Sequence, residues 1–296
     1  MEIRVLKYFL TVAGEGSISR AAETLHITQP TLSRQLSALE EELGVRLFSR
    51  GSRRIALTDE GMLLRRRAEE IVELADRTAA ELPGRSGELE GTVTVGTGEV
   101  AGAEVLARLC GTFREKHPKV TFDLYTAAAD AVKERMERGL TDVGLLMEPV
   151  DLEKFAFIRL PARERFVLLM RPDDPLAEKA SVTREDAAGL PLILPRRLNV
   201  QSELANWFGS CFETLNVAFT GNLPTNKLPV VHQGWAYAIV AEGIPDAWNP
   251  AYVVSRPLEP ELTVGAVLAW KRGQPFSRAA EAFLEHIRCF AGMDQA

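Results

Sequence analysis

The 296-residue sequence has no long hydrophobic run and few cysteines, and both absences narrow the class of protein. No stretch approaches the roughly 18 consecutive apolar residues that would cross a bilayer, so we expect no membrane partner. The N-terminal residues lack the apolar core and cleavage site of a signal peptide, which argues against export. The three cysteines (Cys110, Cys211 and Cys289) are scattered and odd in number, which indicates a reducing compartment and predicts a cytoplasmic protein.

The sequence also lacks the residue clusters that carry metal or catalytic chemistry. Its cysteines fit no metal-ligand spacing. Its four histidines (His26, His117, His232 and His286) have no Cys, Asp or Glu at the spacing of a metal site or a nucleophilic triad. We therefore expect no metal, no cofactor and no catalytic residue, which indicates a binding protein rather than an enzyme.

Negative charge dominates the chain as a whole, with a formal net charge of −6, but it is unevenly distributed. Residues 1–58 carry eight Lys and Arg against six Asp and Glu, whereas residues 59–90 carry five against nine. No acidic residue occurs from Leu43 to Thr58, a segment that contains four arginines. Because charges are screened over about 8 Å at physiological salt, a DNA phosphate would meet this local positive charge rather than the average.

The first 58 residues have the pattern of three short helices. Apolar residues recur at helical spacing over residues 6–13, and glycines end this first helix. Ser17 can cap a second helix that runs through Leu25. Thr28 can cap a third helix, which carries Pro30 in its first turn and stops at residues 43–44. Two helices joined by about three residues predict a helix-turn-helix.

The exposed face of the third helix is the part that would enter the major groove of DNA. Leu32 and Leu36 point inward in the helical pattern, which leaves the opposite face polar. Gln can bond adenine and Arg can bond guanine through paired hydrogen bonds, and a proline can touch a thymine methyl group. The predicted base-contacting residues are Gln29, Pro30, Thr31, Ser33 and Arg34. The alternative for any one of them is a solvated helix face.

Residues 45–57 alternate in polarity and carry a Gly-Ser turn at positions 51 and 52, which predicts a β-hairpin wing. The tip of this wing carries three arginines, Arg50, Arg53 and Arg54. We expect them to contact phosphate or the minor groove, which adds affinity with little sequence information.

Residues 59–90 are expected to form a linker that consists of a long helix and a hinge. Apolar residues follow steps of four and three in a heptad seam made of Leu64, Ala68, Ile71, Ala75, Thr78 and Leu82. So narrow a stripe usually meets another helix, which predicts a homodimer. The alternative is a helix packed against its own domain. Residues 83–87, PGRSG, break the helix.

Residues 91–296 alternate strands and helices, which predicts an α/β domain. Strands over residues 92–95, 120–125 and 143–147 alternate with helices over 103–117 and 129–138. A second unit has strands over 166–170 and 192–194, a helix over 203–215 and an apolar run over 236–240. A strand over 264–270 and a helix over 277–290 end the pattern. We expect a cleft between two subdomains, one of residues 91–160 and 266–296 and one of residues 161–265.

Several runs of residues resemble the LysR-type family of transcriptional regulators. The dense part is SRAAETLHITQPTLSRQ at 19–35, LEEELGVRLFSR at 39–50 and LTDEG at 57–61. Looser matches are HP at 117–118, DVGL at 142–145, RPDDPL at 171–176 and LPLIL at 190–194. The resemblance covers roughly residues 1–290.

This resemblance implies a winged helix-turn-helix over residues 1–58, a coiled-coil linker over 59–90 and an effector-binding domain over 91–296. The effector domain would contain two Rossmann-like subdomains, as in a type II periplasmic binding protein. Its implied partners are double-stranded DNA with a pseudo-palindromic operator, a small organic effector, and one or three further copies of the chain in a homodimer or homotetramer.

One stretch departs from the family pattern. Members of the family commonly show a Gly-x-Gly turn before an apolar strand, and the matching residues here are 231–241. Ala236 replaces the second glycine, while Trp235 and Tyr237 add bulk on either side of it. A ligand therefore cannot be transferred in detail from a relative.

The strand ends of the two subdomains should converge on one cleft. The turn at residues 96–102 is rich in glycine and opens a helix, which favours an anion. Arg196 and Arg197 can pair with a carboxylate, or can form a solvated surface pair. Glu99 favours a partly polar or zwitterionic effector instead. The predicted effector-contacting residues are Thr97, Gly98, Glu99, Thr126, Pro195, Arg196, Arg197, Asn199 and Trp235.

Two other classes of function compete with a ligand-controlled regulator. The glycine pattern of residues 96–102 also resembles the dinucleotide fingerprint of a dehydrogenase. That fingerprint needs an acidic residue at the end of the next strand, where Tyr125, Thr126 and Ala127 stand instead. A purely architectural DNA-binding protein would leave some 200 residues of α/β domain without a role.

Overall fold

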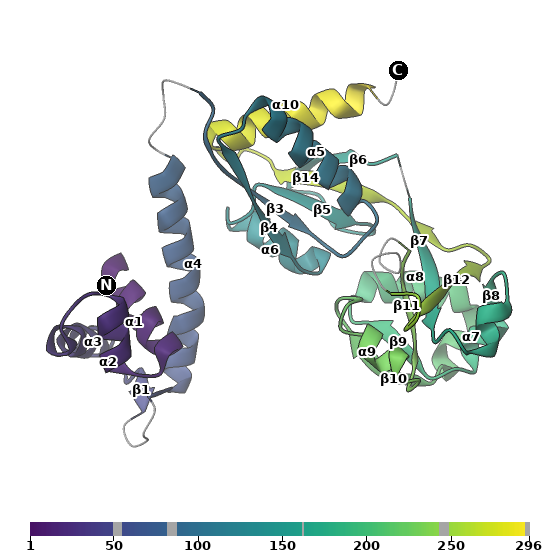
Figure 1. Ribbon diagram of the computed structural model, residues 1–296, viewed down its shortest axis with the longest axis horizontal. Coiled ribbons are helices and arrows are strands. Elements are labelled where there is room, and N and C mark those ends of the chain that lie inside the picture. Colours follow the sequence, from purple (N-terminus) through teal and green to yellow (C-terminus); the bar gives the residue numbers. More distant parts are fainter. Residues whose placement is uncertain (50–54, 82–87, 162, 243–248, 294–296) are drawn as a thin grey trace. The chain divides into compact units, whose positions relative to one another are not determined.

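The computed structural model describes residues 1–49, 55–81, 88–161, 163–242 and 249–293 and divides into two folded units (Figure 1). The first unit is Met1–Arg85 and the second is Ser86–Ala296. The predicted tip of the wing, Leu82 of the predicted seam and residues 83–87 lie outside the described residues. In the part of the chain that is described, no helix is both long and apolar enough to span a bilayer.

The first unit is built on three helices, α1 (Ile3–Glu15), α2 (Ile18–Thr24) and α3 (Gln29–Leu43). The hydroxyl oxygen of Ser17 accepts a hydrogen bond from the backbone N–H of Arg20, and that of Thr28 accepts one from Thr31. Helices α1 and α3 end at glycines with φ of 60° and 69°, a left-handed conformation that glycine adopts without strain. The predicted caps and stops are therefore confirmed.

Helices α1, α2 and α3 share one hydrophobic core. Its fully buried members come from every helix and include Phe9, Val12, Ala21, Leu32 and Leu39. The turn between α2 and α3 places His26 at φ 54°, a left-handed value that non-glycine residues rarely adopt. The helix-turn-helix predicted from the sequence is thus present, with α3 as its second helix.

The wing consists of β1 (Phe48–Ser49) and β2 (Ala56–Leu57), which pair antiparallel. Glu40 of α3 anchors its base, because the backbone N–H groups of Leu47 and Phe48 donate to the Glu40 carboxylate at 2.7 and 3.2 Å. Arg46 donates to the same carboxylate at 2.8 Å. The half-buried Glu40 carboxylate therefore fixes where the hairpin leaves the helical core.

The long helix α4 (Asp59–Glu81) buries only part of the predicted seam in its own unit. Leu64, Ala68 and Val72 pack into the core that α1 helps to form, with Ala68 fully buried. Ile71, which belongs to the same apolar stripe, is 38% exposed. The seam does not face a partner helix along its whole length, because its first two residues belong to the core of their own unit.

The second unit contains two sheets, and the first forms subdomain I (Figure 1). Its strand order is β4-β3-β5-β14-β6. These strands are β3 (Gly91–Thr97), β4 (Val120–Thr126), β5 (Val143–Met147), β6 (Phe155–Arg159) and β14 (Ala266–Lys271). Strands β3, β4 and β5 are parallel, as predicted, and β14 and β6 extend the sheet in antiparallel pairs. Helices α5 (Ala103–Lys116), α6 (Ala129–Glu137) and α10 (Arg278–Met293) pack against it.

Subdomain II is built on the second sheet, in the order β10-β9-β11-β7-β12-β8, with β13 paired to β7. Its strands are β7 (Glu164–Met170), β8 (Val182–Thr183), β9 (Leu192–Pro195), β10 (Val217–Gly221), β11 (Tyr237–Ala241), β12 (Val254–Glu259) and β13 (Thr263–Val264). Its helices are α7 (Arg184–Ala188), α8 (Leu198–Phe208) and α9 (Leu228–His232), with 3₁₀ segments at Pro175–Glu178 and Gly209–Thr214.

The helix predicted over residues 203–215 is wrong at both ends. It begins at Leu198 and gives way at Gly209, whose φ is 59°, to a 3₁₀ segment. The earlier start places Arg197 at the N-cap and Asn199 in the first turn of α8. Both side chains therefore stand at a helix N-terminus instead of in a loop.

The chain crosses between the subdomains twice, after β6 and after β13. The two crossings are bonded to one another, because β13 pairs with β7 through Thr263↔Arg165 and Val264↔Glu164. Gly265 lies in the return crossing, where a Cβ atom would come within 2.1 Å of the Glu148 carboxylate. The crossings thus form a two-stranded connection in which a side chain at position 265 would require the Glu148 carboxylate to move.

Candidate functional site

The N-terminal turn of α3 presents most of the residues predicted to contact DNA bases. Four of them are exposed and Ser33 is half-buried; the exposed ones are Gln29, Pro30, Thr31 and Arg34. The Thr31 hydroxyl lies 2.8 Å from that of Thr28, its N-cap. Among the described residues, none bonds to the Arg34 guanidinium. This face therefore carries one free cation and several hydrogen-bonding groups beside a helix N-terminus.

Of the wing arginines, the described residues include Arg46. Arg50, Arg53 and Arg54 lie outside the described residues. Arg46 is paired with Glu40 at 2.8 Å. Burial alone would raise the pKa of Glu40, but hydrogen bonds from Leu47, Arg46 and Phe48 outweigh it and hold that pKa below its ordinary value. Arg46 is therefore part of the wing anchor.

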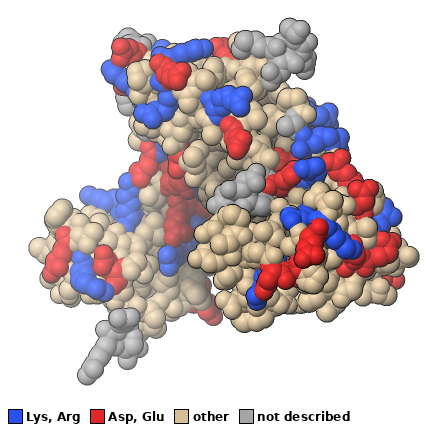
Figure 2. Space-filling view, turned by 45° about the vertical axis from the view of Figure 1, so that its right-hand side comes forward, with Lys and Arg blue, Asp and Glu red and all other residues tan. Residues whose placement is uncertain are grey.

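Surface cations of the second unit are commonly paired. Figure 2 shows Lys and Arg side chains beside Asp and Glu side chains over the face that it draws. Ion pairs of this unit include Arg171 with Asp173 and Lys179 with Asp186, each at 2.6 Å. The unpaired Arg34 of the first unit contrasts with this pattern.

A cavity of about 80 Å³ lies in the second unit between subdomains I and II. Subdomain I contributes Glu99 and Leu145 to its lining, and subdomain II contributes Phe166, Val200 and Ile239. Four of the nine predicted effector-contacting residues line it, namely Gly98, Glu99, Pro195 and Arg197. The predicted convergence of strand ends on a cleft is therefore found for these four.

Lys227 also lines this cavity, although it was not among the residues predicted from the sequence. The residue is 4% exposed, and desolvation lowers its pKa to about 8, against an opposing attraction from Glu99. No described residue accepts a hydrogen bond from its ammonium group. A single lysine in a polar loop is ordinarily solvated, which is why sequence patterning could not single it out.

Glu99 reaches across the cleft from subdomain I to the loop that follows β10. Its carboxylate accepts hydrogen bonds from the backbone N–H of Thr225 at 2.8 Å and from the Thr225 hydroxyl. The loop that carries Thr225 also carries Lys227. Glu99 is therefore occupied by a contact that holds the two subdomains together.

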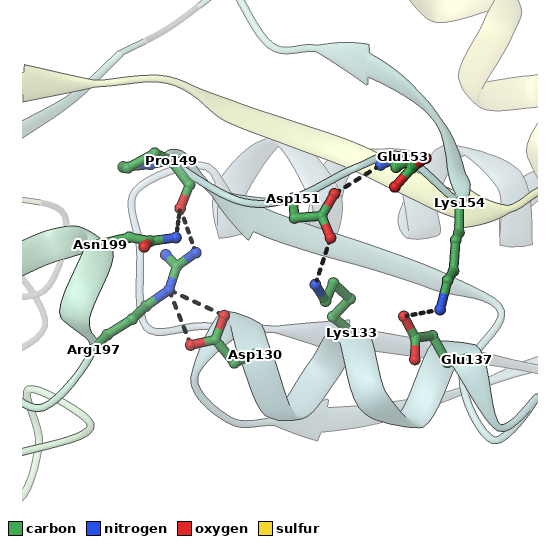
Figure 3. Close-up of polar contacts among 9 residues, drawn as sticks. All are labelled: Asp130, Lys133, Glu137, Pro149, Asp151, Glu153, Lys154, Arg197 and Asn199. Atoms are coloured by element: carbon green, nitrogen blue, oxygen red, sulfur yellow. Dashed lines mark hydrogen bonds and ion pairs between the residues drawn. The ribbon is translucent and has the colours of Figure 1, made fainter.

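Arg197 makes a second set of contacts across the cleft (Figure 3). Its guanidinium donates to the carbonyl oxygens of Met147 at 2.8 Å and Pro149 at 2.6 Å, and it pairs with Asp130 at 3.4 Å. Asn199 adds a hydrogen bond to the same Pro149 oxygen at 3.3 Å. The Arg197 side chain is 8% exposed. Arg197 is therefore neither a solvated surface residue nor free to bind a carboxylate; its donors bridge the subdomains.

The N-terminus of α5, predicted to be open to an anionic ligand, is occupied by the chain itself. The buried Glu164 carboxylate accepts hydrogen bonds from the backbone N–H of Ala101 at 2.9 Å and of Gly102 at 2.7 Å. Gly102 leaves room for this approach, since a Cβ atom there would lie 3.2 Å from the carboxylate. Glu164 opens β7, so this bond joins the crossing to subdomain I.

The remaining predicted effector residues lie away from the cavity. Thr97 and Thr126 are neighbours at the ends of β3 and β4, but Thr126 is exposed and the Thr97 hydroxyl donates to Gly98. Arg196 is exposed, and Trp235 is 64% exposed. Trp235 therefore does not form a wall of the cavity.

Tyr237, the other bulky residue beside Ala236, makes a hydrogen bond within subdomain II. Its hydroxyl donates to the Asp174 carboxylate. Burial, with this bond and the charge of Asp174, raises the pKa of Tyr237 to about 12. In the described part of the chain, no three His, Cys, Asp or Glu residues cluster as metal ligands would.

A winged helix-turn-helix joined to a two-subdomain cleft defines a DNA-binding protein with a ligand-binding domain, and two family models match these units. The model of the bacterial regulatory helix-turn-helix protein of the lysR family matches residues 3–62. That of the LysR substrate binding domain matches residues 86–291. The chain belongs to the LysR family of transcriptional regulators.

Similar proteins span the full length of the chain. The uncharacterized HTH-type transcriptional regulator YvbU of Bacillus subtilis (strain 168) is 30% identical, over 99% of this chain and all of that protein. The crystal structure of CbnR, a LysR family transcriptional regulator, has a TM-score of 0.78 at 25% identity and covers 98% of this chain and 99% of CbnR. Full-length CbnR in complex with its target DNA has a TM-score of 0.75 at 24% identity, with the same coverage.

Proposed function

We propose that the chain is a cytoplasmic transcriptional regulator in which α3 contacts bases of an operator and the cleft cavity binds a small organic effector. The regulator acts by binding and carries no catalytic activity. The family's role in transcription supports this part of the proposal. The observation that carries the effector site is the cavity itself, which is lined by both subdomains and flanked by the cross-cleft bonds of Glu99 and Arg197.

In the proposed DNA complex, the first turn of α3 lies in the major groove. Arg34 bonds guanine and Gln29 bonds adenine, while Pro30 contacts a thymine methyl group. Thr31 and Ser33 add hydrogen bonds to base edges or phosphate. The wing arginines 50, 53 and 54 contact phosphate or the minor groove. Support comes from the exposure of this turn and from the similar CbnR structure with its target DNA.

We further infer that the chain forms a homodimer or a homotetramer on a pseudo-palindromic site. Helix α4 presents large apolar side chains that its own unit does not bury. Met62 is 55%, Leu63 62%, Ile71 38% and Leu74 45% exposed. A second copy of the chain would remove this surface from water.

Selection of bound DNA from a random-sequence pool tests the proposed function directly. Wild-type protein should enrich a pseudo-palindromic sequence. Arg34→Ala should reduce the preference for that sequence over random DNA by about tenfold or more, because one bidentate base contact is worth about 1–3 kcal/mol. Arg65→Ala, which removes an exposed cation paired with Glu69 on α4, is the matched control and should keep the preference. Unchanged preference in Arg34→Ala would show that α3 does not contact bases through this residue.

A further inference from the structure

The cleft cavity contains one positive charge, that of Lys227, which is attracted by Glu99 but forms no hydrogen bond or ion pair with a described residue. Lys227 is 4% exposed, and its ammonium donates to no described residue. Its aliphatic stem is fixed by close packing on Gly221, where a Cβ atom would lie 3.1 Å from Cε and 3.3 Å from Cγ of Lys227. A buried ammonium without a hydrogen-bond partner is energetically unfavourable. An anion that entered the cavity would therefore stabilise the charged form of Lys227.

The other charged groups that line the cavity already have hydrogen-bond partners within the protein. Arg197 donates to two backbone carbonyl oxygens and pairs with Asp130. The Glu99 carboxylate accepts two hydrogen bonds from Thr225. Of the three charged residues that line the cavity, Lys227 is therefore the one whose charge is open to a ligand.

We propose that Lys227 binds the carboxylate of a small monocarboxylic acid with an apolar body and thereby determines which effectors the cleft accepts. This inference rests on the proposed function, because it specifies the ligand of the same cleft. It assigns ligand recognition to Lys227 in place of the predicted arginine pair, since Arg196 is exposed and Arg197 bridges the subdomains.

The remaining lining limits the ligand to one negative charge and a short apolar body. Val100, Leu145, Phe166, Val200 and Ile239 surround the space beside Lys227. A second carboxylate on the ligand would find no free cation and would be repelled by Glu99. The cavity of about 80 Å³ has room for roughly five to eight non-hydrogen atoms, because a single water needs about 10–15 Å³ of such space. Monocarboxylates of four to six carbons have this size.

Thermal unfolding of the full chain with a graded panel of compounds tests the inference. The panel is acetate, butyrate, hexanoate and succinate, together with butyramide and hexanamide as neutral analogues of equal shape. Butyrate or hexanoate should raise the unfolding temperature, whereas the amides and succinate should not. Titration calorimetry should then show at least tenfold weaker binding of that carboxylate to Lys227→Met, which keeps an apolar stem and removes the charge. Arg196→Met, which removes an exposed cation of the same subdomain, should bind as wild type does.

Each other outcome overturns the inference. Equal binding of a carboxylate to wild type and Lys227→Met would place its carboxylate elsewhere. Binding of the amides in preference to the acids would show that the cleft selects a neutral ligand; the proposed effector site would stand and the role of Lys227 would fall. If no monocarboxylate of the panel raises the unfolding temperature, the inference is also excluded. The proposed function would still be supported if the wild-type chain selects an operator.

Discussion

At the scale of single residues, two buried cations of the cleft have different roles that the sequence alone does not separate. Arg197 and Lys227 are both buried and both line the cavity. The planar guanidinium of Arg197 has donors for several acceptors at once, and backbone carbonyls and Asp130 occupy them. Among the described residues, none accepts a hydrogen bond from the Lys227 ammonium. The first residue therefore holds the subdomains together, and the second is available to a ligand.

The burial of Lys227 predicts a pH-dependent stability that Lys227→Met lacks. Desolvation lowers the folded-state pKa to about 8, below the ordinary 10.5, so the unfolded chain binds more protons between these values. Stability of the unliganded wild type should therefore rise with pH across that window relative to Lys227→Met. The full effect is about 3 kcal/mol. Urea unfolding of both proteins at pH 7, 8, 9 and 10 measures it.

The comparison isolates Lys227 because the other ionisable groups that line the cavity, Glu99 and Arg197, are present in both proteins. At pH 7 the wild type carries the whole cost of a buried charge, so the variant should gain most there. A stability difference that stays constant from pH 7 to 10 would show that the ammonium is solvated, and would remove the basis for its role in binding.

At the scale of secondary-structure elements, the apolar residues of α4 have two different surroundings. Leu64, Ala68 and Val72 complete the core of the first unit. Ile71, at the edge of the same apolar stripe, and Leu74, beside it, remain substantially exposed. The sequence pattern could not separate these two groups, because residues three and four apart in a helix are neighbours on its surface. The position of α1 decides which of them are buried.

Charged substitutions on the exposed face of α4 should dissociate the proposed dimer. Ile71→Asp combined with Leu74→Asp would bury two unpaired carboxylates in that interface and should weaken the dimer at least tenfold. Sedimentation velocity over a range of protein concentrations measures the change. Glu69→Ala, which alters an exposed ion pair on the same helix, should leave assembly unchanged. Intact oligomers of the double variant would show that the assembly depends on other surfaces.

The elements that the sequence predicted well are those with local causes. Ser17 and Thr28 cap their helices by side-chain hydrogen bonds, and the glycine at position 44 ends α3 by its left-handed conformation. The start of α8 at Leu198 was missed, because its N-cap is Arg197, which makes no side-chain capping bond. Arg197 is held instead by residues about fifty positions earlier in the chain, a constraint that no local pattern contains.

At the scale of the whole chain, the two crossings and the cross-cleft bonds of the second unit carry the proposed regulation. Glu164 ties a crossing to the N-terminus of α5, while Arg197 and Glu99, which both line the cavity, bond across the cleft. A glycine-rich turn before a helix predicted an anion site, and an anion is found there, but it is a carboxylate of the chain. Which carboxylate reaches a helix N-terminus depends on the tertiary fold, and the sequence could not supply that.

In the proposed regulation, occupancy of the cleft changes how the chain binds DNA. A ligand can do so only if it has different affinities for two arrangements of the protein, and typical couplings change affinity by about 5–150-fold. The decisive measurement is the affinity for the selected operator, by fluorescence anisotropy, while the monocarboxylate that most stabilises the chain is titrated. We predict a change of at least fivefold in wild type, with a midpoint at the ligand dissociation constant, and none at that concentration in Lys227→Met. An operator affinity that stays constant while the ligand saturates the wild-type cleft would show that the cleft does not control DNA binding.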